Sequence, residues 1–171
     1  MVTFRIVQSI AAPPGFVVDW WLDYTPDDPQ LTPGVVTRKV ERLDDRRVHL
    51  RTTSEFGGRE RTTDGVVTRT GPASWEMEGR VLSREKVVSS MRSKYVVEPE
   101  VAGSRVVADF EFVGRSLAWR LAIALSSRAL QRRQLASFRD YAVAIERDFA
   151  ARAPPLRATA ADGRTTTLSG P

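Results

Sequence analysis

Residues 115–150 read RSLAWRLAIALSSRALQRRQLASFRDYAVAIERDFA, and this stretch decides the fold. It contains no glycine and no proline, and apolar side chains such as Phe138, Ala142 and Ile145 recur at helical spacing in its second half. We predict one helix here, roughly 50 Å long at ~1.5 Å per residue, which is long enough to cross an entire curved sheet. A sheet covered by one long helix encloses space between the two, so the pattern predicts binding of an apolar molecule.

The first part of this helix, residues 117–125, is apolar nearly all round, and only Arg120 interrupts it. Such a segment has to cover apolar surface on every side, and one sheet cannot face every side. We therefore expect Trp119 and Ile123 to close one end of a cavity, to dock on a partner subunit or to contact a bilayer. Burial beneath the proline-rich segment 25–34 is the competing interpretation.

The residues before the long helix read mostly as strands. Alternation over 2–10 predicts a first strand, Pro13 and Pro14 end it, and a short helix follows to about residue 24. Turn signals then separate six further β-rich segments: 35–43, 48–56, 59–70, 74–79, 86–98 and 105–113. Because short turns between consecutive strands give antiparallel hairpins, we predict a seven-stranded antiparallel meander.

Length and composition limit the possible functions. The 171 residues suit one domain over 1–151, and residues 152–171 lack periodicity, so we predict a disordered tail there. With no cysteine and one histidine, the chain offers little for thiolate chemistry or a zinc or iron site, and we expect no metal and no cofactor. No apolar run reaches the ~20 residues of a membrane span and no signal peptide is evident, so we expect a cytoplasmic protein.

The net charge of +5 comes from 23 arginines and three lysines against 21 acidic residues. Such a charge can attract nucleic acid or anionic lipid. Most arginines are nevertheless interleaved with acidic residues, and the aromatic residues share the phase of the aliphatic ones, which places them inside the fold rather than on a base-stacking surface. We therefore expect no nucleic-acid partner, keep peripheral membrane contact open, and expect a monomer or a homodimer.

Apolar residues with a few hydroxyls occupy one phase of the predicted strands and helices, a composition typical of small-molecule pockets. A filled core is the competing interpretation for each residue, and no catalytic residue can be assigned. His49 lies out of phase with Val48 and Leu50, so we expect it to face water. We predict that twelve residues line the cavity between sheet and helix: Trp21, Thr52, Phe56, Trp75, Met77, Ser89, Met91, Tyr95, Phe110, Phe112, Trp119 and Phe138.

Local motifs near the N-terminus carry a family resemblance. The first strand ends at residues 12–14 (Ala-Pro-Pro), and Val17, Trp21 and Asp23 follow at the spacing usual in one protein family. Residues 33–35 (Pro-Gly-Val) mark the start of the second strand. With the order of elements, these motifs make the chain resemble the START-like helix-grip superfamily (SRPBCC), in particular its bacterial polyketide cyclase/dehydrase-type members. The resemblance extends over about residues 1–150.

The resemblance implies an α+β helix-grip fold of the START/Bet v 1-like kind. In this fold a curved seven-stranded antiparallel sheet wraps around a long C-terminal helix, with one or two short helices after the first strand. It also implies an internal cavity for sterols, polyketides, lipids or other apolar molecules. It implies no single reaction, because some members cyclise or dehydrate polyketides, some transport lipids and many only bind.

Three functional hypotheses follow. The first is binding of an apolar small molecule or lipid in the cavity, and the second is a polyketide cyclase/dehydratase-type enzyme that uses inward polar residues. The third is a membrane-surface or protein-partner module that uses residues 117–125. The first two differ in whether an ionisable group with a strongly shifted pKa faces the cavity. Four candidates lie on strands whose phase stays open: Arg38, Glu60, Asp64 and Arg69.

Overall fold

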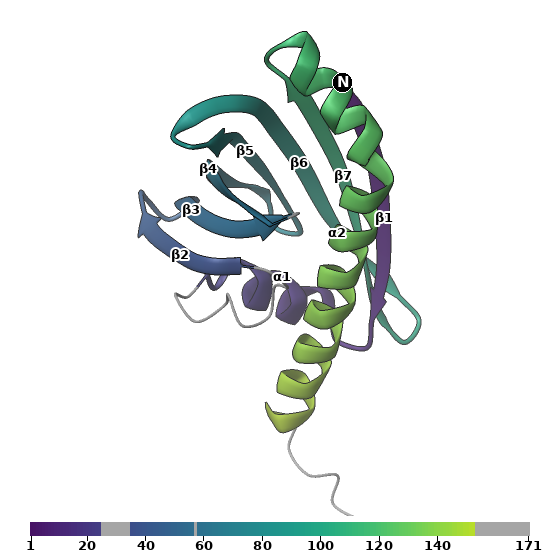
Figure 1. The fold of residues 1–171 in the computed structure, drawn as a ribbon. Helices are drawn as coiled ribbons and strands as arrows, with labels where there is room; N and C mark the ends of the chain where they lie inside the picture. Colours follow the sequence, from purple (N-terminus) through teal and green to yellow (C-terminus); the bar gives the residue numbers. More distant parts are fainter. Residues whose placement is uncertain (25–34, 57, 153–171) are drawn as a thin grey trace, which may run out of the picture.

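A computed structural model describes residues 1–24, 35–56 and 58–152, without the side chain of residue 56. The predicted tail and the proline-rich segment 25–34 therefore lie outside the described residues. The elements, in chain order, are β1 (Val2–Ile10), α1 (Pro14–Leu22), β2 (Val35–Arg42), β3 (Arg47–Phe56), β4 (Arg59–Gly71), β5 (Ser74–Ser83), β6 (Lys86–Glu100), β7 (Gly103–Gly114) and α2 (Leu117–Arg152) (Figure 1).

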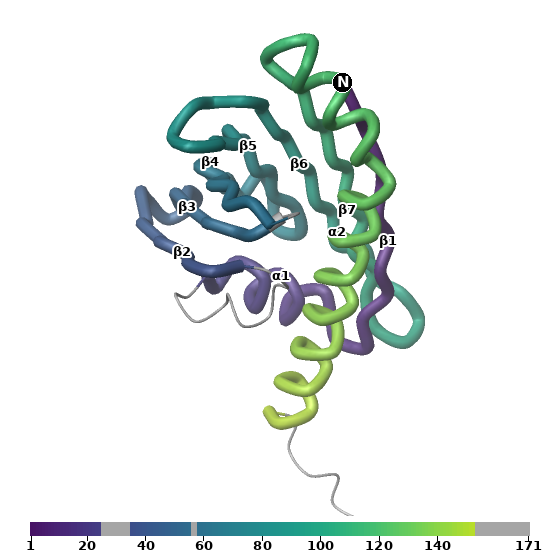
Figure 2. The backbone as a smooth tube through the Cα atoms, viewed as in Figure 1, coloured from purple at the N-terminus to yellow at the C-terminus, as the bar shows by residue number. Residues whose placement is uncertain are grey.

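The described strands form one open antiparallel sheet in the order β1-β7-β6-β5-β4-β3-β2. Consecutive strands from β2 to β7 are neighbours, and the last strand, β7, also pairs with the first strand, β1. The predicted meander and the helix-grip fold are therefore confirmed. Figure 2 shows the backbone of the sheet curving, so that the half containing β2 to β5 turns away from the half that carries α2.

Two glycines allow β4 and β5 to approach closely. Gly65 and Gly79 face each other across the two strands, and a Cβ atom on Gly65 would lie 2.6 Å from a backbone carbonyl oxygen of β5. A Cβ atom on Gly79 would lie 3.0 Å from a backbone oxygen of β4. Only glycine fits such an approach without displacing backbone, which explains why glycine occupies both positions of the pair.

β5 extends furthest beyond its predicted bounds. The sequence analysis ends this strand at residue 79 and leaves residues 80–83 to a turn, but β5 continues to Ser83 and the turn lies at Arg84 and Glu85. These two residues have φ angles of 49° and 61°, as a two-residue hairpin turn with positive φ at both positions requires. Neither is glycine or asparagine, so the sequence lacks the usual signal for this turn.

The core lies between the concave face of the sheet and the second half of α2. Phe138, Ala142 and Ile145 are buried there, and α2 packs against β1 and β7. The short helix α1 buries Val17 and Trp21, and it contacts β6, β7 and α2. Among the described elements, no helix covers the concave side of β2 to β4.

Candidate functional site

An open hollow of about 750 Å³ lies beside α1, between the concave side of β2 to β4 and the C-terminal half of α2. We call it the α1 hollow. Its aromatic wall comes from α1, the residues just after it and α2, and Val48 and Val67 form its floor. The aromatic residues are Phe16, Trp20, Trp21, Tyr24 and Tyr141. A volume of this size falls within the range of about 300–1,000 Å³ for small-molecule sites.

Strand register places two arginines on the inner side of the sheet. Arg38 pairs with Thr52, and Arg69 pairs with Trp75, and both partners belong to the concave face. Both arginines line the α1 hollow. The Arg69 guanidinium donates to the carbonyl oxygens of the β4–β5 turn, at 3.2 Å to Gly71 and 3.1 Å to Pro72, so it is fixed at the rim.

The two acidic candidates with open phase lie on the other side of the sheet. Glu60 pairs with Glu55 and Asp64 pairs with Arg51, and these positions alternate with the inward-facing Leu50. The register therefore separates the four candidates: both arginines face the hollow, and both carboxylates face outward.

Among the described residues that line the hollow, cations outnumber carboxylates, with six arginines and four aspartates. Asp23 lies 3.4 Å from the Arg42 guanidinium at the exposed rim. Asp148 accepts a hydrogen bond of 2.9 Å from the indole of Trp20 and lies 3.0 Å from Arg147. The hydrogen bond from Trp20, together with Arg147, lowers the pKa of Asp148 below its usual range.

These groups favour ion recognition over proton transfer. An arginine stays protonated at any physiological pH, so Arg38 and Arg69 can hold an anionic group but cannot act as a general acid or base. Asp148, whose pKa is lowered, is ionised at neutral pH and has no proton to donate. The arrangement therefore suits a ligand with a ring or chain for the aromatic wall and a negative group for the arginines.

The predicted cavity residues on the sheet face inward, but they pack together. Trp75 stacks on Tyr95 with ring centroids 5.0 Å apart, and Trp21 lies 5.8 Å from Trp75 and 5.1 Å from Phe138. Burial raises the pKa of Tyr95 to about 12, so its hydroxyl stays protonated. The Trp75 Nε1–H is buried, and no acceptor lies within hydrogen-bonding distance among the described residues.

Register places the remaining sheet candidates on the same concave face: Thr52, Met77, Ser89, Met91, Phe110 and Phe112. Ser89, Phe110 and Phe112 are buried, and the others are partly buried. The side chain of Phe56 lies outside the described part of the structure. Of the twelve predicted residues, Trp21 lines the α1 hollow, and Trp119 lies at the opposite end of α2 beneath Arg61, 5.3 Å from that guanidinium.

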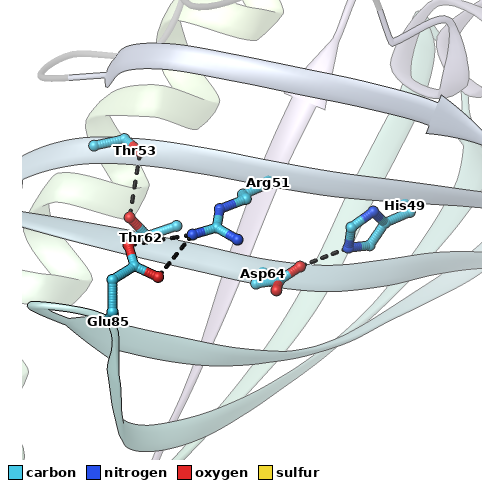
Figure 3. A network of polar contacts seen from close by, with 6 residues as sticks. All are labelled: His49, Arg51, Thr53, Thr62, Asp64 and Glu85. Atoms are coloured by element: carbon cyan, nitrogen blue, oxygen red, sulfur yellow. Dashed lines mark hydrogen bonds and ion pairs between the residues drawn. The ribbon is translucent and has the colours of Figure 1, made fainter.

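The single histidine belongs to a polar network on the outer face of the sheet (Figure 3). The His49 Nε2 atom lies 2.5 Å from an Asp64 carboxylate oxygen, and Arg51 forms an ion pair of 3.0 Å with Glu85. His49 therefore lies on the side of β3 away from the α1 hollow, as its phase predicted.

Within the described residues, no cluster of histidine and acidic side chains is arranged to hold a metal ion. None of the described helices is sufficiently long and apolar to cross a bilayer.

The sequence named Arg38 and Arg69 as candidates but did not decide which face of the sheet they occupy. The segment 35–43 begins with two adjacent valines, and β2 contains an irregularity between Val35 and Thr37 that changes the phase of pairing. In β4 the two valines, Val66 and Val67, are also adjacent, so alternation alone does not select the inner face. The inner face of β4 is identified by Val67, which pairs with the inward-facing Val48 of β3. This pairing is known only once the register of the two strands is known.

Comparison with known proteins places this geometry in a family. The profile of the family described as "Polyketide cyclase / dehydrase and lipid transport" matches residues 1–143. The aromatase/cyclase Zhui from Streptomyces sp. R1128 is similar in structure, with a TM-score of 0.70 and 16% identity over 85% of this chain and 94% of that chain.

Two further solved structures share the fold at low identity. The chain matches the di-domain ARO/CYC StfQ of the steffimycin biosynthetic pathway with a TM-score of 0.70 and 14% identity, over 88% of this chain and 52% of that one. A STAR-related lipid transfer protein fragment from Xanthomonas axonopodis has a TM-score of 0.65 and 14% identity, with coverages of 84% and 85%. A search of curated protein sequences finds no significant match.

The family profile, in contrast, matches residues 1–143, which is most of the chain. This protein therefore belongs to the polyketide cyclase / dehydrase and lipid transport family.

Proposed function

We propose that this protein binds an amphiphilic small molecule in the α1 hollow, with the apolar body of the ligand on the aromatic wall and an acidic group on Arg38 and Arg69. The placement of these two arginines on the concave face, beside Trp21, is the observation that supports the proposal. Family membership supports a small-molecule or lipid ligand of largely apolar character.

The aromatic wall defines the apolar part of the ligand. Trp20 and Tyr141 meet edge to face with centroids 6.1 Å apart, and Trp21 meets Tyr141 at 5.2 Å. Rings held in this way present flat apolar surfaces whose own positions are fixed by packing. A ring system or an acyl chain therefore fits against them without ordering several flexible side chains.

The arginines and Asp148 support binding of an anionic group more directly than they support catalysis. A cyclase or dehydratase needs a group that gives or takes a proton at the reacting carbon chain. In the hollow, the pKa of Asp148 is shifted away from neutrality, and arginine does not exchange protons at physiological pH. The enzymatic hypothesis therefore remains an alternative with no specific observation in its favour.

The test compares acids with neutral analogues of the same shape. Calorimetric titration with 2-naphthoate and decanoate is expected to show saturable binding, and 2-naphthylmethanol and decanol are expected to bind roughly tenfold more weakly, as the loss of one charge-assisted contact predicts. Arg38→Gln is expected to remove this preference for the acid. Arg80→Gln is the matched control, because Arg80 is exposed on the outer face of β5 and does not line the hollow.

Two results would contradict the proposal. One is equal affinity of the protein for acids and alcohols, and the other is an unchanged preference in Arg38→Gln. Formation of a cyclised or dehydrated product from an added poly-β-keto thioester, by contrast, would support the enzymatic alternative.

A further inference from the structure

The first turns of α2 expose a row of leucines. Leu117, Leu121 and Leu125 have exposed fractions of 81%, 60% and 80%, and their spacing of four residues places them on one side of the helix. Trp119 and Ile123 point to the other side, where they are partly buried. We call the row of three leucines the leucine face. Exposed apolar residues on a soluble domain are usually scattered singly, so a row of three large ones indicates a contact surface.

The leucine face continues along the helix as a row of positive charge. Arg128 and Arg132 lie on the same arc of α2, three and seven residues beyond Leu125, and both are exposed. No aspartate or glutamate occurs anywhere from residue 112 to residue 139. Apolar side chains and cations therefore share one surface, and α2 contributes no carboxylate to it before Asp140.

Other elements meet α2 at this end of the molecule. Met1 is 75% exposed, and the pairing of Val2 with Phe112 places the N-terminus near the end of β7, as Figure 1 shows. The β5–β6 turn, which shares a concavity with Trp119, adds the exposed Arg84. The acidic residues lining that concavity are Glu60 and Glu85, and Glu85 is paired with Arg51.

We propose that the leucine face docks on an anionic lipid bilayer. In this arrangement Leu117, Leu121 and Leu125 enter the boundary between headgroups and acyl chains, and Arg128 and Arg132 contact the phosphates. A bilayer with anionic lipids offers apolar and negative surface together, which is the complement of what α2 exposes. Nucleic acid would leave the leucines in water. If two copies packed these helix surfaces together, an antiparallel arrangement would place arginines against leucines, and a parallel arrangement would place arginines against arginines.

The docking surface is separate from the α1 hollow. The α2 residues that line the hollow begin at Tyr141, and the 16 residues from Leu125 to Tyr141 span about 24 Å of helix. The proposal therefore does not rest on ligand binding in the hollow, and either can fail without the other.

Co-sedimentation with vesicles tests the docking. The intact protein is expected to bind vesicles of equal parts phosphatidylglycerol and phosphatidylcholine, to bind pure phosphatidylcholine far more weakly, and to be released by high salt. Replacing all three leucines with serine is expected to lower the partition coefficient more than tenfold. The control Val143→Ser, at an equally exposed valine further along α2, is expected to change nothing. Arg128→Gln and Arg132→Gln are each expected to lower binding to the anionic vesicles about fivefold.

A fluorescent label reports the contact without disturbing the leucines as a set. Because the chain has no cysteine, Leu121→Cys carries an environment-sensitive dye at one position only. We expect a blue shift of its emission with the anionic vesicles, and no shift from the same dye at Val143→Cys. Absence of binding to the anionic vesicles, equal binding to both lipid compositions, or equal shifts at both positions would overturn the proposal. So would a dimer that dissociates when the three leucines are replaced, because the leucine face would then be a subunit interface.

Discussion

Replacing Trp21 with alanine tests how the short helix is fixed to the core. Trp21 is only 8% exposed, and its ring lies 5.1 Å from Phe138, 5.2 Å from Tyr141, 5.8 Å from Trp75 and 6.1 Å from Tyr95. Truncating a buried tryptophan to alanine costs about 3–5 kcal/mol of unfolding free energy. Because one side of the ring borders the α1 hollow, water can enter the space it leaves, so we expect the lower end, about 3 kcal/mol. For a chain of this length, such a loss lowers Tm by roughly 6–12 °C.

The neighbouring tryptophan provides the matched control. Trp20 is only partly buried, and its main contacts are the hydrogen bond to Asp148 and the edge of Tyr141. We expect Trp20→Ala to cost about 1–2 kcal/mol, from one hydrogen bond to a charged group and one aromatic contact. Urea unfolding followed by circular dichroism gives both free energies. If Trp21→Ala is no less stable than Trp20→Ala, the assignment of Trp21 to the core is wrong.

Three further predictions concern stability. Deleting residues 153–171, which lack apolar periodicity, is expected to leave Tm within about a degree, and a fall of many degrees would show that they pack on the domain. Gly65→Ala is expected to cost about 1–3 kcal/mol because its Cβ would press on a β5 carbonyl, whereas Gly15→Ala, with open space around it, is expected to cost nothing in the same urea titration. The hydrogen bond from Trp20 lowers the pKa of Asp148 below 3.8, so this group adds stability above that pH that is lost as the pH falls through the lowered value. Asp148→Asn is therefore expected to flatten the acid side of the stability profile, and an unchanged profile would contradict the role of this contact.

The fold was readable from sequence because its signals are local. The long helix lacks glycine and proline, and alternation in residues 48–56 and 105–113 marks which face of each strand is inside. Tight turns between successive strands then leave an antiparallel meander as the natural topology. The end of β5 was misplaced because its turn uses Arg84 and Glu85, two residues without the usual preference for positive φ.

The site was less readable because it depends on long-range register. Whether Arg38 and Arg69 face inward is decided by their partners on β3 and β5, which no local pattern encodes. The orientation of the side chains at the start of α2 also depends on long-range contacts. The sequence shows that 117–125 is apolar all round, but only the packing of Trp119 against the sheet end leaves the leucines as the exposed side.

The most direct test of the proposed binding uses the indole N–H signals of the four tryptophans in a 1H–15N NMR titration with decanoate. Each signal can be assigned by a single Trp→Phe substitution. Because Trp20 and Trp21 line the α1 hollow and Trp119 lies near the other end of α2, we predict saturable shifts at Trp20 and Trp21, smaller shifts with decanol, and none at Trp119. Signals of Trp20 and Trp21 that stay in place, or shifts confined to Trp119, would contradict binding in the hollow.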